Sequence, residues 1–174
     1  MLLKNGKTLT IRKAKKEDAQ EILGYLKKVG GESDNLTFGA EGLPYTVEQE
    51  EKVLESYYHS TSSVYLVGVV DGRIICTGNV SSPTRERLSH KATIGISVLK
   101  EFWGLGVGTC LMNELIDFAK NSDKIEMLHL GVKSDNVNAI ALYKKCGFEQ
   151  IGVYPKFFKI DGVYYDEVLM NLYI

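Results

Sequence analysis

The sequence predicts one α/β domain spanning residues 1–174, with a central mixed, mostly antiparallel sheet and helices on both of its faces. Three observations lead to this fold class. Strand and helix patterns alternate along the chain, and two Asp-Gly dipeptides separate β-rich runs as in antiparallel hairpins. Between these hairpins, a strand-helix-strand pattern predicts a crossover connection. A chain of 174 residues that is 44% hydrophobic suits a single core.

In order, the predicted elements are β-α-α-β-β-β-α-β-α-β-β. They are a strand at 8–13, helices at 19–29 and 47–58, strands at 63–70, 73–80 and 91–99, a helix with its apolar stripe over 111–119, a strand at 128–132, a helix at 136–145, and strands at 148–160 and 163–173.

Local signals support these assignments. The first helix has apolar residues at helical spacing and stops at Gly30-Gly31. A polar loop over 32–45 precedes Thr46 and Gln49, whose spacing is that of a capping box. Asp71-Gly72 and Asp161-Gly162 are favoured in type I′ turns, where both central residues need a positive φ.

Composition excludes several classes of function. The 21 basic and 22 acidic residues nearly cancel, which argues against nucleic-acid and membrane partners. No apolar run reaches the roughly 20 residues that cross a bilayer, and no secretory leader is evident, so we expect a cytoplasmic protein. The three cysteines, Cys76, Cys110 and Cys146, fit neither a disulfide framework nor a zinc site, and we expect buried thiols and no metal.

The most informative stretch is the strand-to-helix junction that contains Gly104, Gly106 and Gly108. Glycines let the backbone curl closely around a ligand, and free N–H groups at a helix start can hold a phosphate. A turn that needs small residues only for packing is the alternative. The dinucleotide fingerprint fails because Leu111 stands at its third glycine, and the Gly-Lys-Ser/Thr of a P-loop is absent.

The junction segment VLKEFWGLGVGT, residues 98–109, resembles the acyl-CoA motif of the Gcn5-related N-acetyltransferase superfamily, which is commonly Gln/Arg-x-x-Gly-x-Gly/Ala. A second segment, NVNAIALYKKCGF at 136–148, resembles the second cofactor segment of that family. Weaker likeness extends over nearly the whole chain. Trp103 departs from the pattern, because the family usually has Gln or Arg there. The resemblance implies the family's single-domain fold and acetyl-CoA as cosubstrate.

The resemblance also implies a role for each matching residue. The strand backbone at Ile96, Ser97 and Val98 would pair with the pantetheine arm, and Asn136 and Tyr143 would point at the cofactor from one helix face. For Asn136 a plain helix cap is an equal alternative, and for Tyr143 a core tyrosine. The backbone amides of the junction would cradle the pyrophosphate; these are Trp103, Gly104, Leu105, Gly106, Val107, Gly108 and Thr109.

The expected chemistry is direct attack of an amine on the acetyl thioester, and it needs a proton donor for the departing thiolate. Tyr143 is the candidate general acid. The attacking amine must be neutral, and a lysine or polyamine amine would need a base or desolvation. Glu41, His90, Glu126 and His129 are base candidates, each of which also suits a surface or packing role. Some relatives carry a carboxylate near Ala92, and this chain does not.

The sequence therefore predicts an N-acetyltransferase acting on a small-molecule or peptide amine, as a monomer or homodimer. The alternatives are a non-catalytic acyl-CoA-binding module and, less favoured, a dinucleotide enzyme. Substrate choice should lie in the 30–45 loop and the C-terminal hairpin, because loops on a rigid scaffold usually supply specificity. Aromatic residues there could wall a pocket or simply pack across strands, and acids could attract a cation. The aromatic residues are Phe38, Tyr45, Phe157, Phe158 and Tyr164, and the acids are Glu41, Asp161 and Asp166.

Overall fold

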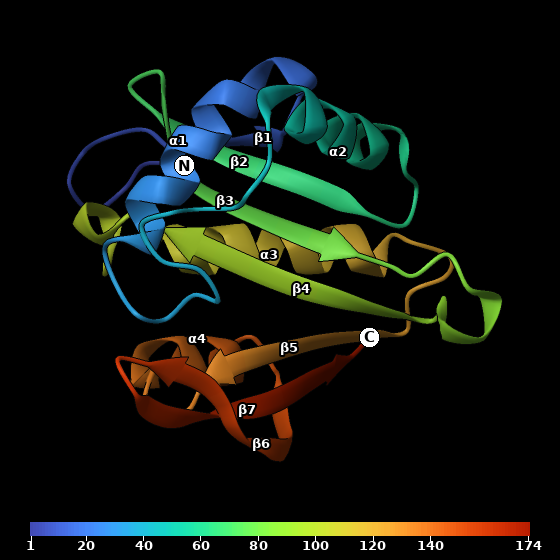
Figure 1. Cartoon of the computed structure of the whole chain (residues 1–174). Coiled ribbons are helices and arrows are strands. Elements are labelled where there is room, and N and C mark those ends of the chain that lie inside the picture. The colour runs from blue at the N-terminus through green and yellow to red at the C-terminus, as the bar shows by residue number, and fades with distance from the viewer.

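A computed structural model describes all residues, Met1–Ile174, and shows one mixed sheet with helices packed on it (Figure 1). Its elements are β1 (Thr10–Lys13), η1 (Lys16–Asp18), α1 (Ala19–Gly30), α2 (Val47–His59), β2 (Val64–Val70), β3 (Arg73–Ser81), η2 (Glu86–Leu88), β4 (Lys91–Val98), η3 (Lys100–Phe102), α3 (Val107–Lys120), β5 (Met127–Lys133), α4 (Val137–Lys145), β6 (Glu149–Ile160) and β7 (Val163–Tyr173). The predicted order of strands and helices is confirmed.

The seven strands lie in the order β1-β2-β3-β4-β5-β7-β6, and every neighbouring pair is antiparallel except β4 and β5. This parallel pair is joined only where Lys91–Thr93 face Met127–His129. Beyond Thr93 the two strands separate (Figure 1). The sheet therefore contains an open wedge between β4 and β5, and the loop into α3 leaves β4 at the open end.

Alternate residues of β4 contact helices on opposite faces of the sheet. The Ser97 hydroxyl is 2.9 Å from the Tyr25 hydroxyl of α1, whereas a Cβ at Gly108 of α3 would lie 3.7 Å from the Ile96 side chain. This alternation is the normal pleat of a strand. Helices α1 and α2 thus cover one face over the N-terminal strands, and α3 covers the other.

Helix and turn signals in the sequence have their expected geometry. The Gln49 N–H donates to the Thr46 hydroxyl at 3.2 Å and the Thr46 N–H donates to the Gln49 side chain at 2.9 Å, which is a capping box. Both Asp-Gly turns have two positive φ values, 50° and 77° at Asp71-Gly72 and 48° and 81° at Asp161-Gly162. These are the values that a type I′ turn requires.

The structure corrects the prediction for the cysteines and shifts the start of the first strand. Only Cys76 is buried; Cys110 and Cys146 are partly exposed, because they lie in the first turn of α3 and at the end of α4. The first strand begins at Thr10 rather than at residue 8, since Thr8 makes an isolated bridge to Leu2 instead. No helix combines the length and apolar character needed to span a membrane.

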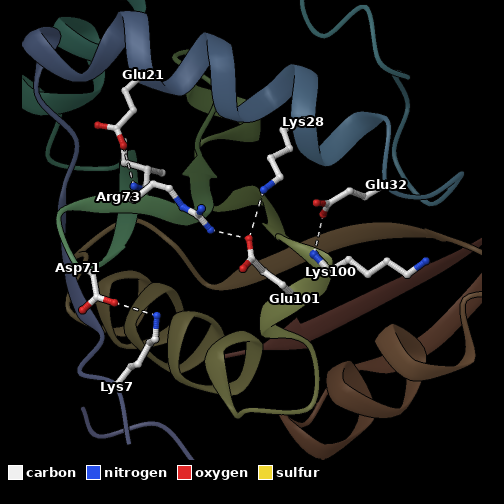
Figure 2. Close-up of polar contacts among 9 residues, drawn as sticks. Lys7, Glu21, Lys28, Glu32, Asp71, Arg73, Lys100 and Glu101 are labelled. Carbon is white, nitrogen blue, oxygen red and sulfur yellow. Dashed lines mark hydrogen bonds and ion pairs between the residues drawn. The ribbon is translucent and has the colours of Figure 1, made fainter. Parts of the chain in front are cut away.

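Polar contacts fix α1 against the turn that precedes the glycine loop (Figure 2). Glu101 of η3 pairs with Lys28 of α1 and with Arg73 at the start of β3. The Lys100 N–H donates to the Glu32 carboxylate at 2.6 Å. Each exposed pair contributes little alone, but together they join three segments at one point. The beginning of the glycine loop is held in place by these contacts.

Candidate active site

A cleft of about 1130 Å³ lies in the open wedge between β4 and β5. Its walls include the end of β4, the glycine loop with the start of α3, the facing part of β5, and α4. Every residue that the sequence predicted to contact the cofactor lines this cleft. They are Ile96, Ser97, Val98, Trp103, Gly104, Leu105, Gly106, Val107, Gly108, Thr109, Asn136 and Tyr143.

The glycine loop presents a continuous row of free hydrogen-bond donors. None of the six backbone N–H groups from Gly104 to Thr109 donates to a group in the protein, whereas that of Cys110 donates to the Gly106 carbonyl at 3.0 Å. The prediction that the Trp103 amide belongs to this row is wrong, because it donates to the Lys100 carbonyl at 3.1 Å. The row ends in the first turn of α3, where the helix dipole also favours negative charge. Donors arranged in this way suit a phosphate or pyrophosphate.

Two glycines of the loop serve different physical needs. Gly106 caps α3 with a φ of 91°, which L-residues adopt only with strain. Gly108 has ordinary dihedral angles, but a Cβ there would come within 3.2 Å of Leu142 on α4. The first glycine thus shapes the loop, and the second lets α3 and α4 approach each other beside the cleft.

The backbone of β4 has free polar groups only at alternate residues. Leu99 donates its N–H to Ile75 of β3, so by alternation Ser97 also directs its backbone groups to β3, and those of Ile96 and Val98 face the wedge. The Val98 carbonyl already accepts a 2.8 Å hydrogen bond from the indole Nε1 of Trp103. Ile96 therefore offers the freest backbone groups for an extended ligand in the wedge, and the prediction that the Ser97 backbone pairs with such a ligand is wrong because it faces β3.

The Ser97 hydroxyl has two protein partners. It lies 2.9 Å from the Tyr25 hydroxyl and 3.0 Å from the Thr77 hydroxyl, both on the α1 face of the sheet. Burial raises the pKa of Tyr25 far above its usual range, so this phenol stays protonated. The Ser97 side chain is therefore held in the sheet, although the residue lines the cleft.

Asn136 and Tyr143 both lie on α4 at the cleft. The Asn136 side-chain oxygen accepts from the Ala139 N–H at 3.3 Å and so caps the helix. The capping interpretation of Asn136 is thus confirmed, and a further contact of its side-chain amide with a ligand stays a prediction. Tyr143 is 9% exposed and packs against Phe148, with ring centroids 6.1 Å apart.

The Tyr143 hydroxyl makes no hydrogen bond to the protein, yet it is not sealed from solvent. Burial among apolar side chains raises the pKa of Tyr143 to about 12, because the ionised phenol would be poorly solvated there. The phenol is thus fully protonated at any physiological pH. It can donate a hydrogen bond or a proton into the cleft.

None of the four base candidates from the sequence lines this cleft. Glu41 accepts from the Gly39 N–H and lines a separate pocket of about 460 Å³ beside α1. His90 and Glu126 lie at the closed end of the wedge, where the Glu126 N–H donates to the His90 carbonyl. The His129 ring is 2.8 Å from the Asn171 side chain.

Two acidic residues that the sequence reasoning missed line the cleft, Glu114 of α3 and Glu167 of β7, and Glu167 lies where β7 meets β5. It is opposite Lys133 of β5 in the sheet register, and its carboxylate lies over Gly131. Burial raises the pKa of Glu167 above its usual value. No sequence signal marked it, because its place in the cleft depends on the pairing of β7 with β5.

Most of the aromatic residues that the sequence suggested as pocket walls lie outside the cleft. Phe158 lines the cleft, whereas Phe157 and Tyr164 are exposed on the C-terminal hairpin and Tyr45 lines the pocket beside α1. Phe157 packs edge-on against Phe158 with centroids 4.9 Å apart. No group of three or more His, Cys, Asp or Glu side chains is placed to hold a metal ion.

A splayed sheet with a row of free amides at its open end is the architecture of a protein that binds a phosphate-bearing ligand in the wedge. The family model described as "Acetyltransferase (GNAT) family" matches residues 35–148. The matched region contains β4, the glycine loop, β5 and α4, whereas Phe158 and Glu167 of the cleft lie outside it. The chain belongs to the GNAT family of acetyltransferases, which are acyltransferase enzymes.

Named relatives agree with this membership. The L-amino acid N-acetyltransferase AaaT of Escherichia coli is 35% identical over 105 residues, which are 60% of this chain and 65% of that protein. The chain thus spans slightly less than two thirds of this relative.

Solved structures share the whole fold. A GNAT-family acetyltransferase from Streptococcus pneumoniae is 30% identical, with a TM-score of 0.94 over 96% of this chain and 100% of that chain. The yncA structure from Salmonella typhimurium, solved with its cofactor acetyl-CoA, has a TM-score of 0.82 at 19% identity, over 95% of this chain and 93% of that chain. At that identity the likeness concerns the fold.

Proposed function

We propose that this chain is an acetyl-CoA-dependent N-acetyltransferase that forms one domain over residues 1–174 and acetylates a primary amine of a small molecule or peptide. The observation that carries the proposal is the row of six unpaired amides from Gly104 to Thr109 in a cleft of about 1130 Å³. Free donors at a glycine-rich helix start suit a phosphate or pyrophosphate.

The residues of the cleft suit acetyl-CoA along its length. The glycine-loop amides would hold the pyrophosphate, and Lys4 and Lys145 add positive charge at the cleft wall. The free backbone groups of Ile96 would pair with the amides of the pantetheine arm, as a neighbouring strand does. Bound there, acetyl-CoA supplies an activated acyl group.

The side chains of the cleft then have definable tasks. Tyr143 keeps its proton at neutral pH and would deliver it to the departing sulfur. Leu130 and Val132 are apolar walls that limit water around the reacting atoms. The acceptor must arrive as a neutral amine, and an α-amine with a pKa near 8 is partly neutral already.

Thiol release from acetyl-CoA across a panel of amines tests the proposal. The panel includes L-amino acids, which the name of the Escherichia coli relative indicates, together with peptides bearing a free N-terminus, lysine side-chain analogues and polyamines. We expect amine-dependent release of one thiol per amine acetylated, with mass spectrometry identifying the amide.

Two other outcomes would each support a different function for this chain. Tight binding of CoA without release for any amine would indicate a non-catalytic acyl-CoA-binding module. Thermal stabilisation by NAD and not by CoA would indicate a dinucleotide enzyme, since a ligand that binds the folded state raises the Tm. The results of these tests do not depend on whether the protein is cytoplasmic or on whether it is a monomer or a homodimer.

A further inference from the structure

Glu167 has an unusual position among the acidic residues of the sheet. Its side chain crosses from β7 onto β5 and lies in the space that a side chain at Gly131 would fill, because a Cβ at Gly131 would collide with the Glu167 carboxylate. Gly131 and Glu167 both line the cleft. A glycine on β5 thus makes room for a carboxylate supplied by the neighbouring strand.

This carboxylate has no partner in the protein. It forms no salt bridge, although Lys133 lies directly opposite it in the strand register. The Lys133 ammonium is instead bound to both carboxylate oxygens of Asp135, at 2.7 and 2.6 Å, and lies over the Tyr165 ring. The remaining neighbours are His129 on β5, which is hydrogen-bonded to Asn171, and Tyr154 opposite Glu167 on β6.

Glu167 and Tyr143 reach the same cleft from opposite faces of the sheet. The parallel register pairs Ala92 with Leu128, so Leu130 and Val132 face α3 as Ile96 does, and α4, which carries Tyr143, packs against α3. Residue 131 alternates with them, so Gly131 and the carboxylate above it are on the other face. A thioester between these faces would have a proton donor on one side and a free carboxylate on the other.

We propose that Glu167 is the general base of the acetyl transfer, accepting the proton that the amine nitrogen loses as it forms its bond to the acetyl carbon. This inference rests on the proposed function. As the C–N bond forms and the C–S bond breaks, one proton passes from nitrogen to the Glu167 carboxylate, and one passes from the Tyr143 hydroxyl to the departing sulfur. Return of these protons through solvent restores both groups.

The test compares Glu167→Gln with the wild type, using the best amine of the panel. We expect kcat at pH 7 to fall about 100-fold or more, as for loss of a general base, with the Kd for CoA unchanged. Both enzymes need the neutral amine, so the deficit should persist as the pH approaches the pKa of the amine. Glu126→Gln, at the closed end of the wedge, is the matched control and should retain its rate.

A second variant moves the carboxylate without removing it. Gly131→Ala places a methyl group against Glu167, so we expect a lower kcat, while retained CoA binding and Tm would show that the fold is intact. Glu167→Asp should recover part of the rate lost in Glu167→Gln.

Two results would overturn the inference. One is an unchanged kcat in Glu167→Gln, and the other is a loss confined to KM, which would make Glu167 only a cation-binding residue. Absence of amine-dependent release by the wild type would instead contradict the proposed function itself.

Discussion

The indole Nε1 of Trp103 donates a 2.8 Å hydrogen bond to the main-chain oxygen of Val98, which ties the glycine loop to the end of β4. Trp103 is 44% exposed as a residue, and the one polar atom of its side chain is engaged in the protein. Trp103 thus replaces the family's usual Gln or Arg with a residue that shapes the loop.

Replacing Trp103 should have a small effect on the cofactor. We expect Trp103→Gln and Trp103→Phe to change the Kd for CoA by no more than about fivefold, because one exposed hydrogen bond contributes roughly 1 kcal/mol. Isothermal titration calorimetry measures the affinity. A loss beyond about 30-fold in both variants would mean that the indole itself contacts the ligand.

Gly106→Ala should weaken CoA binding at least about tenfold. Its φ of 91° costs an alanine roughly 1–2 kcal/mol, and relaxation of that strain turns the free amides away from the cleft. Gly162→Ala is the control, because Gly162 has a φ of 81°, equally open surroundings and a position at a hairpin tip. Both variants should lower the Tm by a few degrees, and only Gly106→Ala should change the Kd.

Tyr143→Phe should lower kcat by about 100-fold or more and leave the Tm nearly unchanged, since no protein group is hydrogen-bonded to the lost hydroxyl. The exposed Tyr164→Phe is its control. With a pKa raised to about 12, the phenol keeps its proton below that pH. The rate of the wild type should therefore stay on its plateau up to about pH 10, and a decline centred near pH 10 would contradict an acid with this pKa.

Glu50→Gln should raise the Tm at pH 7 by a few degrees. Glu50 is 2% exposed, and burial raises the pKa of its carboxyl because the charged form is poorly solvated. A raised pKa makes the carboxylate destabilise the fold at neutral pH, and the cost vanishes in acid, where the group is protonated in both states. The gain should thus shrink toward pH 4. Glu55→Gln, exposed on the same helix, should change the Tm little at either pH.

Local chemistry was sufficient to predict most of the fold. The Asp71-Gly72 turn and the Thr46 cap depend on adjacent residues, and the structure confirms both. The glycine loop could be located because its spacing reflects backbone geometry that only a short segment must satisfy.

Pairings between distant strands were not predictable in the same way. The position of Glu167 depends on the register of β7 against β5 and on a glycine 36 residues earlier. The exposure of Cys110 depends on how α3 meets the cleft, since thiols in a helix are otherwise often buried. The partner of the Trp103 indole likewise depends on how the loop folds back on β4.

The short join between β4 and β5 has a thermodynamic consequence. Strands β1–β4 and β5–β7 form two blocks whose direct hydrogen-bonded contact is confined to Lys91–Thr93 and Met127–His129. An extended ligand bound between them would add hydrogen bonds across the gap and so join the two blocks. If the proposed cosubstrate binds there, amides flanking the gap should exchange with deuterium more slowly as the concentration of free ligand rises.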